Sequence, residues 1–461
     1  PHTNRRGLSV GWTVAVWLSY ILSQADHRLS YVESWAGEQL TTLQALLPAA
    51  VTSRDFTDDR LGDVLLALSN DAVWQAIEVE LGQQIIQVYA LPQDRVHVDS
   101  TTAALYHEPE GNPLVEFGQS KDHRPDLAQF KVMVSSLGPF GLPLATLVVS
   151  GNRADDGLYL PAIEQSRQVL QRRGLLYIGD SKMEALSIRA ALVAGHDFYL
   201  TPLSKKGTQE QLLRDLLEPV WAGQQSLTDI HAPESEASDR RLLAQGYETV
   251  RSLTAQIAGE SLTWDERLLA VYSPTLAEAG NKGLTQRLQR AQEALRALTP
   301  PPSRGRRQFA ELAPLQRAVD VILKRYQVTN LLTVTYDRQE NQRHVRAYQE
   351  RPARTETTVR YQLQVTPNPD AIDLVRRRLG WRLFVTNAAP EQLSLEEAVR
   401  AYREGPLHEH NFSRLKNRPL GLRPLFVHRQ DHMLGLVRLL SLALRVLTLV
   451  EFVVRRELQQ Q

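Results

Sequence analysis

Between residues 95 and 204, short apolar runs alternate with helical segments, and this order limits the folds open to the chain. Apolar and alternating patterns predict strands at 95–101, 128–137, 142–149, 175–180 and 197–201. Helices are predicted at 156–173 and 182–194, the second of which ends at Gly195. Three strands followed by helix, strand, helix and strand predict an α/β core built on a mixed sheet.

Acidic residues end two of these apolar runs, and a third lies on a late helix. Asp99 follows Val96-His97-Val98, Asp180 follows Leu175-Leu176-Tyr177-Ile178-Gly179, and Glu409 lies within Tyr402-x6-Glu409-x6-Lys416. Taken alone, an Asp after a strand is usually a helix cap or turn residue. Together, the three carboxylates suit chemistry that holds two divalent cations about 4 Å apart around a phosphodiester. Mg²⁺ prefers oxygen ligands of this kind.

With these residues, the chain resembles bacterial insertion-sequence transposases of the DDE type, which have a ribonuclease-H-like catalytic core. It is most similar to the group that carries a Y-x2-R-x3-E-x6-K signature. Tyr402, Glu409 and Lys416 match that spacing, whereas Gly405 stands at the arginine position and Arg403 lies nearby. Three further stretches are similar to this group, at residues 120–127, 150–153 and 415–420, and the resemblance covers residues 8–455.

The resemblance implies a ribonuclease-H-like mixed sheet core, a helical N-terminal region and a large α+β insertion before the last catalytic helix. In such a core the first and fourth strands are neighbours, which brings Asp99 and Asp180 side by side. It also implies that Asp99, Asp180 and Glu409 are catalytic and hold two Mg²⁺ or Mn²⁺ ions. The reaction would nick a transposon end and then use the freed 3′-hydroxyl to attack the opposite strand or the target DNA. The expected partners are terminal inverted repeats and target DNA, with a homodimer in the DNA complex.

Polar and basic residues near the three carboxylates are candidates for holding DNA. They are Lys121, His123, Arg124, Tyr402, Arg403, Lys416 and Arg418. Glu409 and Lys416 are seven residues apart on a helix and therefore share a face. A metal at the carboxylate and a lysine two turns away could grip one DNA strand. The alternative for this pair is a distant surface pair of opposite charges, which contributes little. The alternative for residues 121–124 is a hairpin loop satisfied by local hydrogen bonds.

The stretch between Asp180 and Glu409 is far longer than a minimal core needs, so we predict an insertion at 205–378. Its predicted helices are at 208–218, 274–298 and 311–326, and its predicted strands are at 246–258, 265–272, 329–337, 343–350 and 356–366. A proline-rich basic loop lies at 299–307. The other predicted parts are a helical region at 1–92 that could recognise DNA ends or only support the core, a first core segment at 93–204, and the rest of the core with C-terminal helices at 379–461.

Composition narrows the function classes. The chain of 461 residues is long enough for two to four domains. It has no cysteine, which excludes disulfides, thiolate zinc sites and cysteine nucleophiles and suits a reducing cytoplasm. The resemblance implies a bacterial cytoplasmic protein that associates with the nucleoid when it acts, and the lack of cysteine is compatible with this. The net charge of +1 means that any DNA contact must come from local basic patches.

The two ends of the chain give weaker signals. Its first residue is Pro1 rather than Met, which is the pattern of a chain that continues upstream, and no secretory signal is visible. The most apolar stretch, 434–454, is interrupted by Arg438, Arg445 and Glu451. It is therefore expected to form a packed C-terminal helix rather than a membrane span, and no membrane partner is expected.

Three functions remain open from the sequence. The first is a DNA transposase that cleaves and joins strands. The second is a metal-dependent nuclease of the same fold that cuts without joining. The third is an inactive DNA-binding transposase relic, which Gly405 in place of the signature arginine keeps open.

Overall fold

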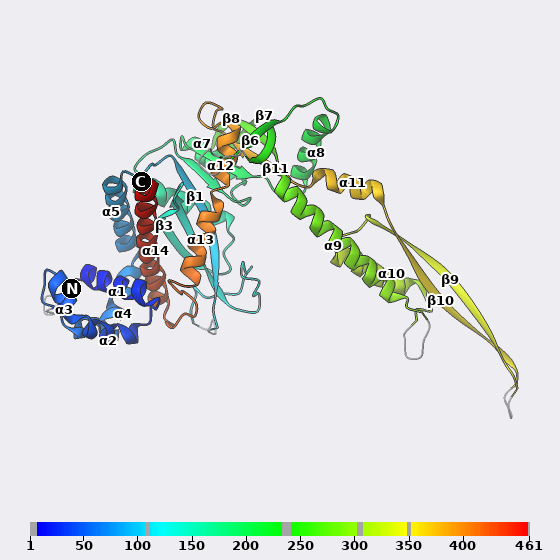
Figure 1. Cartoon of the computed structure of the whole chain (residues 1–461), viewed down its shortest axis with the longest axis horizontal. Coiled ribbons are helices and arrows are strands. Elements are labelled where there is room, and N and C mark those ends of the chain that lie inside the picture. The colour runs from blue at the N-terminus through cyan, green and yellow to red at the C-terminus, as the bar shows by residue number, and fades with distance from the viewer. Residues whose placement is uncertain (1–6, 107–110, 233–240, 302–307, 348–351, 460–461) are drawn as a thin grey trace. The chain divides into compact units, whose positions relative to one another are not determined.

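The computed structural model describes residues 7–106, 111–232, 241–301, 308–347 and 352–459. It divides into two compact units (Figure 1). The first unit comprises Pro1–Gln225, Tyr247–Leu269 and Leu383–Gln461, and the second comprises Ser226–Gly246 and Ala270–Arg382. The predicted α/β class is confirmed, since helices accompany one large mixed sheet.

The first unit begins with helices, as predicted for residues 8–90. They are α1 (Val10–Gln24), α2 (Val32–Glu38), α3 (Leu40–Leu46), α4 (Asp58–Ser69) and α5 (Asp71–Tyr89). Side chains of Ser9 and Asn70 accept hydrogen bonds from backbone amides at the starts of α1 and α5, which satisfies donors that a helix start leaves unpaired. Trp17 of α1 and Leu65 of α4 are fully buried and belong to one large apolar cluster.

The central sheet has the strand order β3-β2-β1-β4-β5-β11-β8-β7-β6. The strands are β1 (Arg95–Ala104), β2 (Gln129–Leu137), β3 (Leu142–Ser150), β4 (Leu176–Gly179), β5 (Phe198–Pro202), β6 (Thr228–His231), β7 (Leu242–Ile257), β8 (Glu260–Tyr272) and β11 (Trp381–Thr386). The β1–β2 and β2–β3 pairs are antiparallel, whereas β1, β4 and β5 run parallel. All five strands predicted between residues 95 and 204 are present, and the short β6 was not predicted.

Helices of the first unit accompany this sheet. They are α6 (Tyr159–Leu170), α7 (Leu186–Ala194), α8 (Thr208–Trp221), α12 (Leu395–Tyr402), α13 (Gly405–Lys416) and α14 (Gln430–Gln459). A capping box between Ser394 and Glu397 starts α12, as the sequence indicates. Figure 1 shows α5 and α14 side by side, and a buried ion pair between Glu78 and Arg445 joins them.

The C-terminal helix α14 is long and apolar enough to cross a membrane by length and composition alone. Its apolar window is 72% buried inside the protein, however. Leu436, Leu440 and Leu444 belong to the same apolar cluster as α1 and α4. Arg438 and Arg445 are buried and donate hydrogen bonds to carbonyl groups of Leu68 and Leu144. These are the features of a packed core helix, as predicted.

The second unit holds α9 (Pro274–Leu298), α10 (Leu312–Arg325), β9 (Leu332–Val345), β10 (Arg354–Pro367) and α11 (Pro369–Arg378). The two separate strands predicted at 329–337 and 343–350 are wrong, because β9 runs continuously through the polar residues between them. In a two-stranded ladder both faces are largely exposed, so polar side chains do not end the strand. Residues 348–350 and 302–307 of the predicted strand and basic loop lie outside the described residues.

The boundaries of the units differ from the predicted insertion at 205–378. Helix α8 and residues Tyr247–Leu269 of the β7–β8 hairpin belong to the first unit. Glu266 of that hairpin is fully buried and accepts hydrogen bonds from Tyr199, Arg189 and Arg251, also of the first unit. The division of the chain into four functional parts stays a prediction.

Candidate metal and DNA site

Sheet pairing places two of the predicted carboxylates on neighbouring strands. Strands β1 and β4 are parallel, with Val98 opposite Gly179. Asp99 is the next residue of β1, and Asp180 directly follows the last residue of β4, so the two lie side by side. This neighbourhood of the first and fourth strands matches what the resemblance implies.

A buried tyrosine holds the second carboxylate. The hydroxyl of Tyr159, at the start of α6, donates a 2.6 Å hydrogen bond to Oδ1 of Asp180. The backbone amide of Lys182 donates to the same oxygen at 2.8 Å. The pKa of Tyr159 lies well above its usual value because burial, and then the carboxylates of Asp180 and Asp99, disfavour loss of its proton. Tyr159 is therefore a neutral donor that fixes how Asp180 points.

A lysine ammonium group lies beside the first carboxylate. Nζ of Lys121 is 3.4 Å from Oδ1 of Asp99 and 3.7 Å from Oδ2 of Asp155. It also donates to the backbone oxygen of Ser100 at 2.7 Å and to the Ser100 hydroxyl at 2.8 Å. Burial raises the pKa of Asp99, the Lys121 ammonium opposes this shift, and Asp180 adds to it. The Lys121 ammonium therefore offsets part of the cost of burying the Asp99 carboxylate.

The Asp99–Asp180 pair fits a divalent metal ion. The hydrogen bonds of both carboxylates within the described chain use only Oδ1, so each Oδ2 has no such bond to described residues. Two carboxylate oxygens together with water and substrate phosphate are a usual ligand set for Mg²⁺. The residues that would hold the ion are Asp99 and Asp180.

The structure does not group the third predicted carboxylate with the first two at liganding distance. Glu409 is an exposed residue of α13. No cluster of three or more His, Cys, Asp or Glu side chains able to hold a metal ion occurs within the described ranges. The role of Glu409 as a metal ligand stays a prediction.

Buried histidines pack α13 onto β1. The rings of His97 and His408 stack with their centroids 4.0 Å apart. Burial lowers the pKa of His97 to about 3 and also lowers that of His408, so both rings are neutral. Glu404 lies 3.3 Å from Nε2 of His97 and accepts a 2.8 Å hydrogen bond from Arg95. These contacts fix α13 against β1, and Glu409 is the residue of α13 that follows His408.

The predicted DNA-binding residues lie in different settings. Lys416 is only 13% exposed and donates a 2.7 Å hydrogen bond to Asp122. Arg124 forms an ion pair with Asp126. His123 and Arg418 are exposed, and His123 has a left-handed backbone conformation.

The remaining two predicted residues lie at the end of α12. The ring of Tyr402 packs edge-on against Phe384, with centroids 4.7 Å apart. Arg403, which follows it, is exposed.

Four residues at this site were not among the candidates predicted from the sequence: Asp155, Tyr159, Glu404 and Arg423. Tyr159 and Glu404 stand in ordinary helical sequence, and no local pattern indicates that they reach β4 or β1. Arg423 is part of a basic stretch after Glu409, which the sequence does show. Asp155 lies just beyond the 150–153 stretch.

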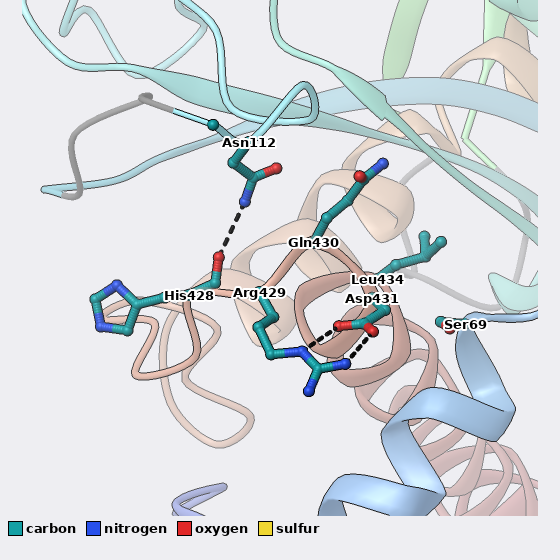
Figure 2. Close-up of a pocket in the computed structure, with 8 residues that line it drawn as sticks. Ser69, Asn112, His428, Arg429, Gln430, Asp431 and Leu434 are labelled. Atoms are coloured by element: carbon teal, nitrogen blue, oxygen red, sulfur yellow. Dashed lines mark hydrogen bonds and ion pairs between the residues drawn. The ribbon is translucent and has the colours of Figure 1, made fainter.

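One cavity of the described structure is lined by residues other than those of this site (Figure 2). It has a volume of about 540 Å³ and lies where α14 begins. Figure 2 shows Arg429 turned toward Asp431, with which it forms an ion pair, and Asn112 bonded to the backbone oxygen of His428. None of the predicted site residues lines this cavity. Its one arginine, Arg429, pairs with Asp431, so the cavity is not part of the candidate site.

No protein-family model matches the chain, and no curated protein is similar to it in sequence.

Proposed function

We propose that the protein is a DNA transposase that cleaves transposon ends and joins them to target DNA, using a ribonuclease-H-like core. The observation that carries the proposal is the pairing of β1 with β4, which sets Asp99 beside Asp180. Oδ2 of each carboxylate accepts no hydrogen bond from described residues, and the Lys121 ammonium lies 3.4 Å from Asp99. This combination suits a phosphodiester substrate.

The topology supports the proposed core. Its first five strands have the spatial order β3-β2-β1-β4-β5, with β2 antiparallel to β1 and β4 parallel to it. The sequential order of three strands, helix, strand, helix and strand is the one expected of a ribonuclease-H-like fold. The α13 helix, which carries Glu409, packs against β1 through the His97–His408 stack.

The chemistry divides between the protein and its metal ions. Two bound divalent cations would lower the pKa of an attacking water or 3′-hydroxyl and stabilise the leaving oxygen. Asp99 and Asp180 would hold them, with Glu409 as the third proposed ligand. Tyr159 keeps Asp180 oriented through its hydrogen bond. Lys416 and Arg418 would hold phosphates of the DNA strand, which positions the scissile bond without a covalent protein–DNA intermediate.

A non-catalytic DNA-binding relic is the second candidate. The exposed position of Glu409, together with the absence of a three-residue metal cluster within the described ranges, favours it. The two candidates differ in strand cleavage, whereas both bind DNA.

The test is cleavage of a transposon-end duplex with Mg²⁺ or Mn²⁺, run beside a gel-shift assay. Asp99→Asn, Asp180→Asn and Glu409→Gln should each abolish cleavage, because each removes a charge that holds a cation while keeping the side-chain shape. Binding should persist, since it depends mainly on phosphate contacts elsewhere. Cleavage that survives in one variant would remove that residue from the site. A wild-type protein that binds DNA ends but never cuts them would establish the relic.

A further inference from the structure

One carboxylate near the site is bound by two cations at once. Lys416 Nζ donates to Oδ1 of Asp122 at 2.7 Å, and Arg423 Nη1 donates to Oδ2 at 2.7 Å. The side chains of Lys416, Arg423 and Asp122 are 13%, 29% and 15% exposed. Each carboxylate oxygen therefore has its own cationic donor in a mostly enclosed setting. Two donors that converge on two oxygens of one anion are also how proteins bind phosphate.

The backbone builds this pair of cations independently of Asp122. Lys416 is the last residue of α13, and the chain then turns back so that the amide of Arg423 donates to the carbonyl of Lys416 at 3.3 Å. The amide of Leu422 donates to the carbonyl of Leu415 at 3.0 Å. Leu415 and Leu422 are buried, which anchors the turn. The backbones of Lys416 and Arg423, hereafter the cation cradle, are therefore held together by contacts that do not involve Asp122.

Asp122 reaches the cradle from a loop that also reaches the metal site. Its neighbour Lys121 lies against Asp99, as described above. The Lys121 amide donates to Thr102 of β1 at 3.0 Å, which ties the loop backbone to the strand. One loop thus presents a positive group to Asp99, a predicted metal ligand, and a negative group to Lys416, a predicted DNA-binding residue, and to Arg423. In this pattern Lys121 takes the place of a metal cation beside Asp99, and the Asp122 carboxylate takes the place of a phosphate between the two cations.

We propose that the cation cradle is a binding site for one DNA phosphate and that Asp122 fills it in the DNA-free protein. This inference rests on the proposed function, since it needs DNA to be the ligand. A phosphate that enters the cradle must displace the Asp122 carboxylate, so Asp122 weakens DNA binding. Arg423 becomes a phosphate-contacting residue beside Lys416. The alternative is that Asp122 only fastens the loop to the end of α13.

The test measures DNA affinity in EDTA, so that it does not depend on bound metal or on cleavage. The probe is a short fluorescent duplex of mixed sequence, followed by anisotropy at several salt concentrations. Asp122→Asn keeps the side-chain shape but removes the competing charge, so it should tighten binding about tenfold. The salt dependence should steepen by about one unit, because the cradle gains one net positive charge.

Two controls separate this effect from general electrostatics. Asp156→Asn removes the same charge from an exposed residue that forms no ion pair with other described residues, and it should change affinity about twofold or less. In an Arg423→Gln background, Asp122→Asn should tighten binding by only about threefold or less, because the cradle is already broken. Asp122→Ser serves as a second variant, and thermal unfolding checks that each protein is folded.

The outcomes distinguish the inference from the function. A wild-type protein that does not bind DNA at all would overturn both. If wild type binds but Asp122→Asn and Asp122→Ser bind no tighter, Asp122 is only a loop fastener and the inference fails alone. The inference also fails if the gain is the same with and without Arg423, because the gain would then be a general charge effect.

Discussion

Tyr159 shows how a residue that is not itself a metal ligand can orient a carboxylate that is proposed to be one. Tyr159 donates to Oδ1 of Asp180 and leaves Oδ2 for a cation. The phenol is fully enclosed, so it has no water to compete for that bond. Loss of such an outer hydrogen bond typically lowers metal affinity about 10–100-fold.

Removing the Tyr159 hydroxyl tests this role. Tyr159→Phe should weaken Mn²⁺ binding about 10–100-fold while the protein stays folded, because the ring still fills the same space. Titration of the DNA-free protein with Mn²⁺, followed by calorimetry or electron paramagnetic resonance, measures it. Tyr177→Phe is the matched control, since Tyr177 is an equally buried residue of β4 whose hydroxyl lies near Arg167 instead. Equal metal affinity in both variants would contradict a positioning role for Tyr159.

For single residues, the sequence identifies which carboxylates are candidates but not which side chains they contact. Asp99 and Asp180 stand out because each ends an apolar run, and strand pairing then brings them together. The contact of Asp122 with Lys416 and Arg423 joins residues nearly 300 positions apart. It depends on how a loop folds over the end of α13, and no local pattern encodes that.

Among elements, α14 and α5 are joined by a buried charge pair. Arg445 Nη2 donates to Oε1 of Glu78 at 2.7 Å, and both side chains are 2% exposed. Burial raises the pKa of Glu78 to about 7 even with Arg445 alongside. The desolvation of Glu78 is the largest influence on its pKa, so the loss of one partner should cost more than the loss of both.

Substitutions at this pair should be strongly non-additive. Glu78→Leu or Arg445→Leu alone should each lower the free energy of unfolding by about 3–5 kcal/mol, because each leaves a buried charge without its partner. The double variant should lose less than either single one. Urea denaturation measures all three. Arg455→Ala breaks an exposed pair with Glu451 on the same helix and should change stability by about 0.5 kcal/mol or less. Additive losses would show that the two side chains act independently.

The elements that the sequence predicted correctly are those with a strong pattern. Strands β1 and β2 carry runs of apolar residues that are largely buried within a large sheet, and α9 has a long amphipathic repeat. The prediction failed at β9, whose polar residues resemble a loop until the partner strand β10 is known. It also missed β6 and α11, of 4 and 10 residues, since short segments carry little periodicity.

On the scale of the whole molecule, each unit has its own apolar core. The cluster of the first unit includes residues of α1, α4 and α14, such as Trp17, Leu65 and Leu440. The cluster of the second unit is separate and includes Leu284, Leu295 and Leu315 of α9 and α10. The sequence predicts that the chain has more than one core from its length, but not where the cores divide. The division falls within the β7–β8 hairpin, of which Tyr247–Leu269 belong to the first unit.

Because each unit has its own core, we expect a core substitution to destabilise only the unit that contains it. Leu315 is fully buried in the second unit, so Leu315→Ala should destabilise that unit by about 2–5 kcal/mol through lost apolar contacts and a cavity. Leu65→Ala should do the same to the first unit. Differential scanning calorimetry should then resolve two transitions, of which each variant lowers one, because cooperative unfolding is a property of a single core. DNA binding by the Leu315→Ala protein, measured below its lower transition, should match wild type, since the proposed phosphate contacts belong to the first unit. One shared transition that both variants lower equally would show that the units unfold as a single cooperative body.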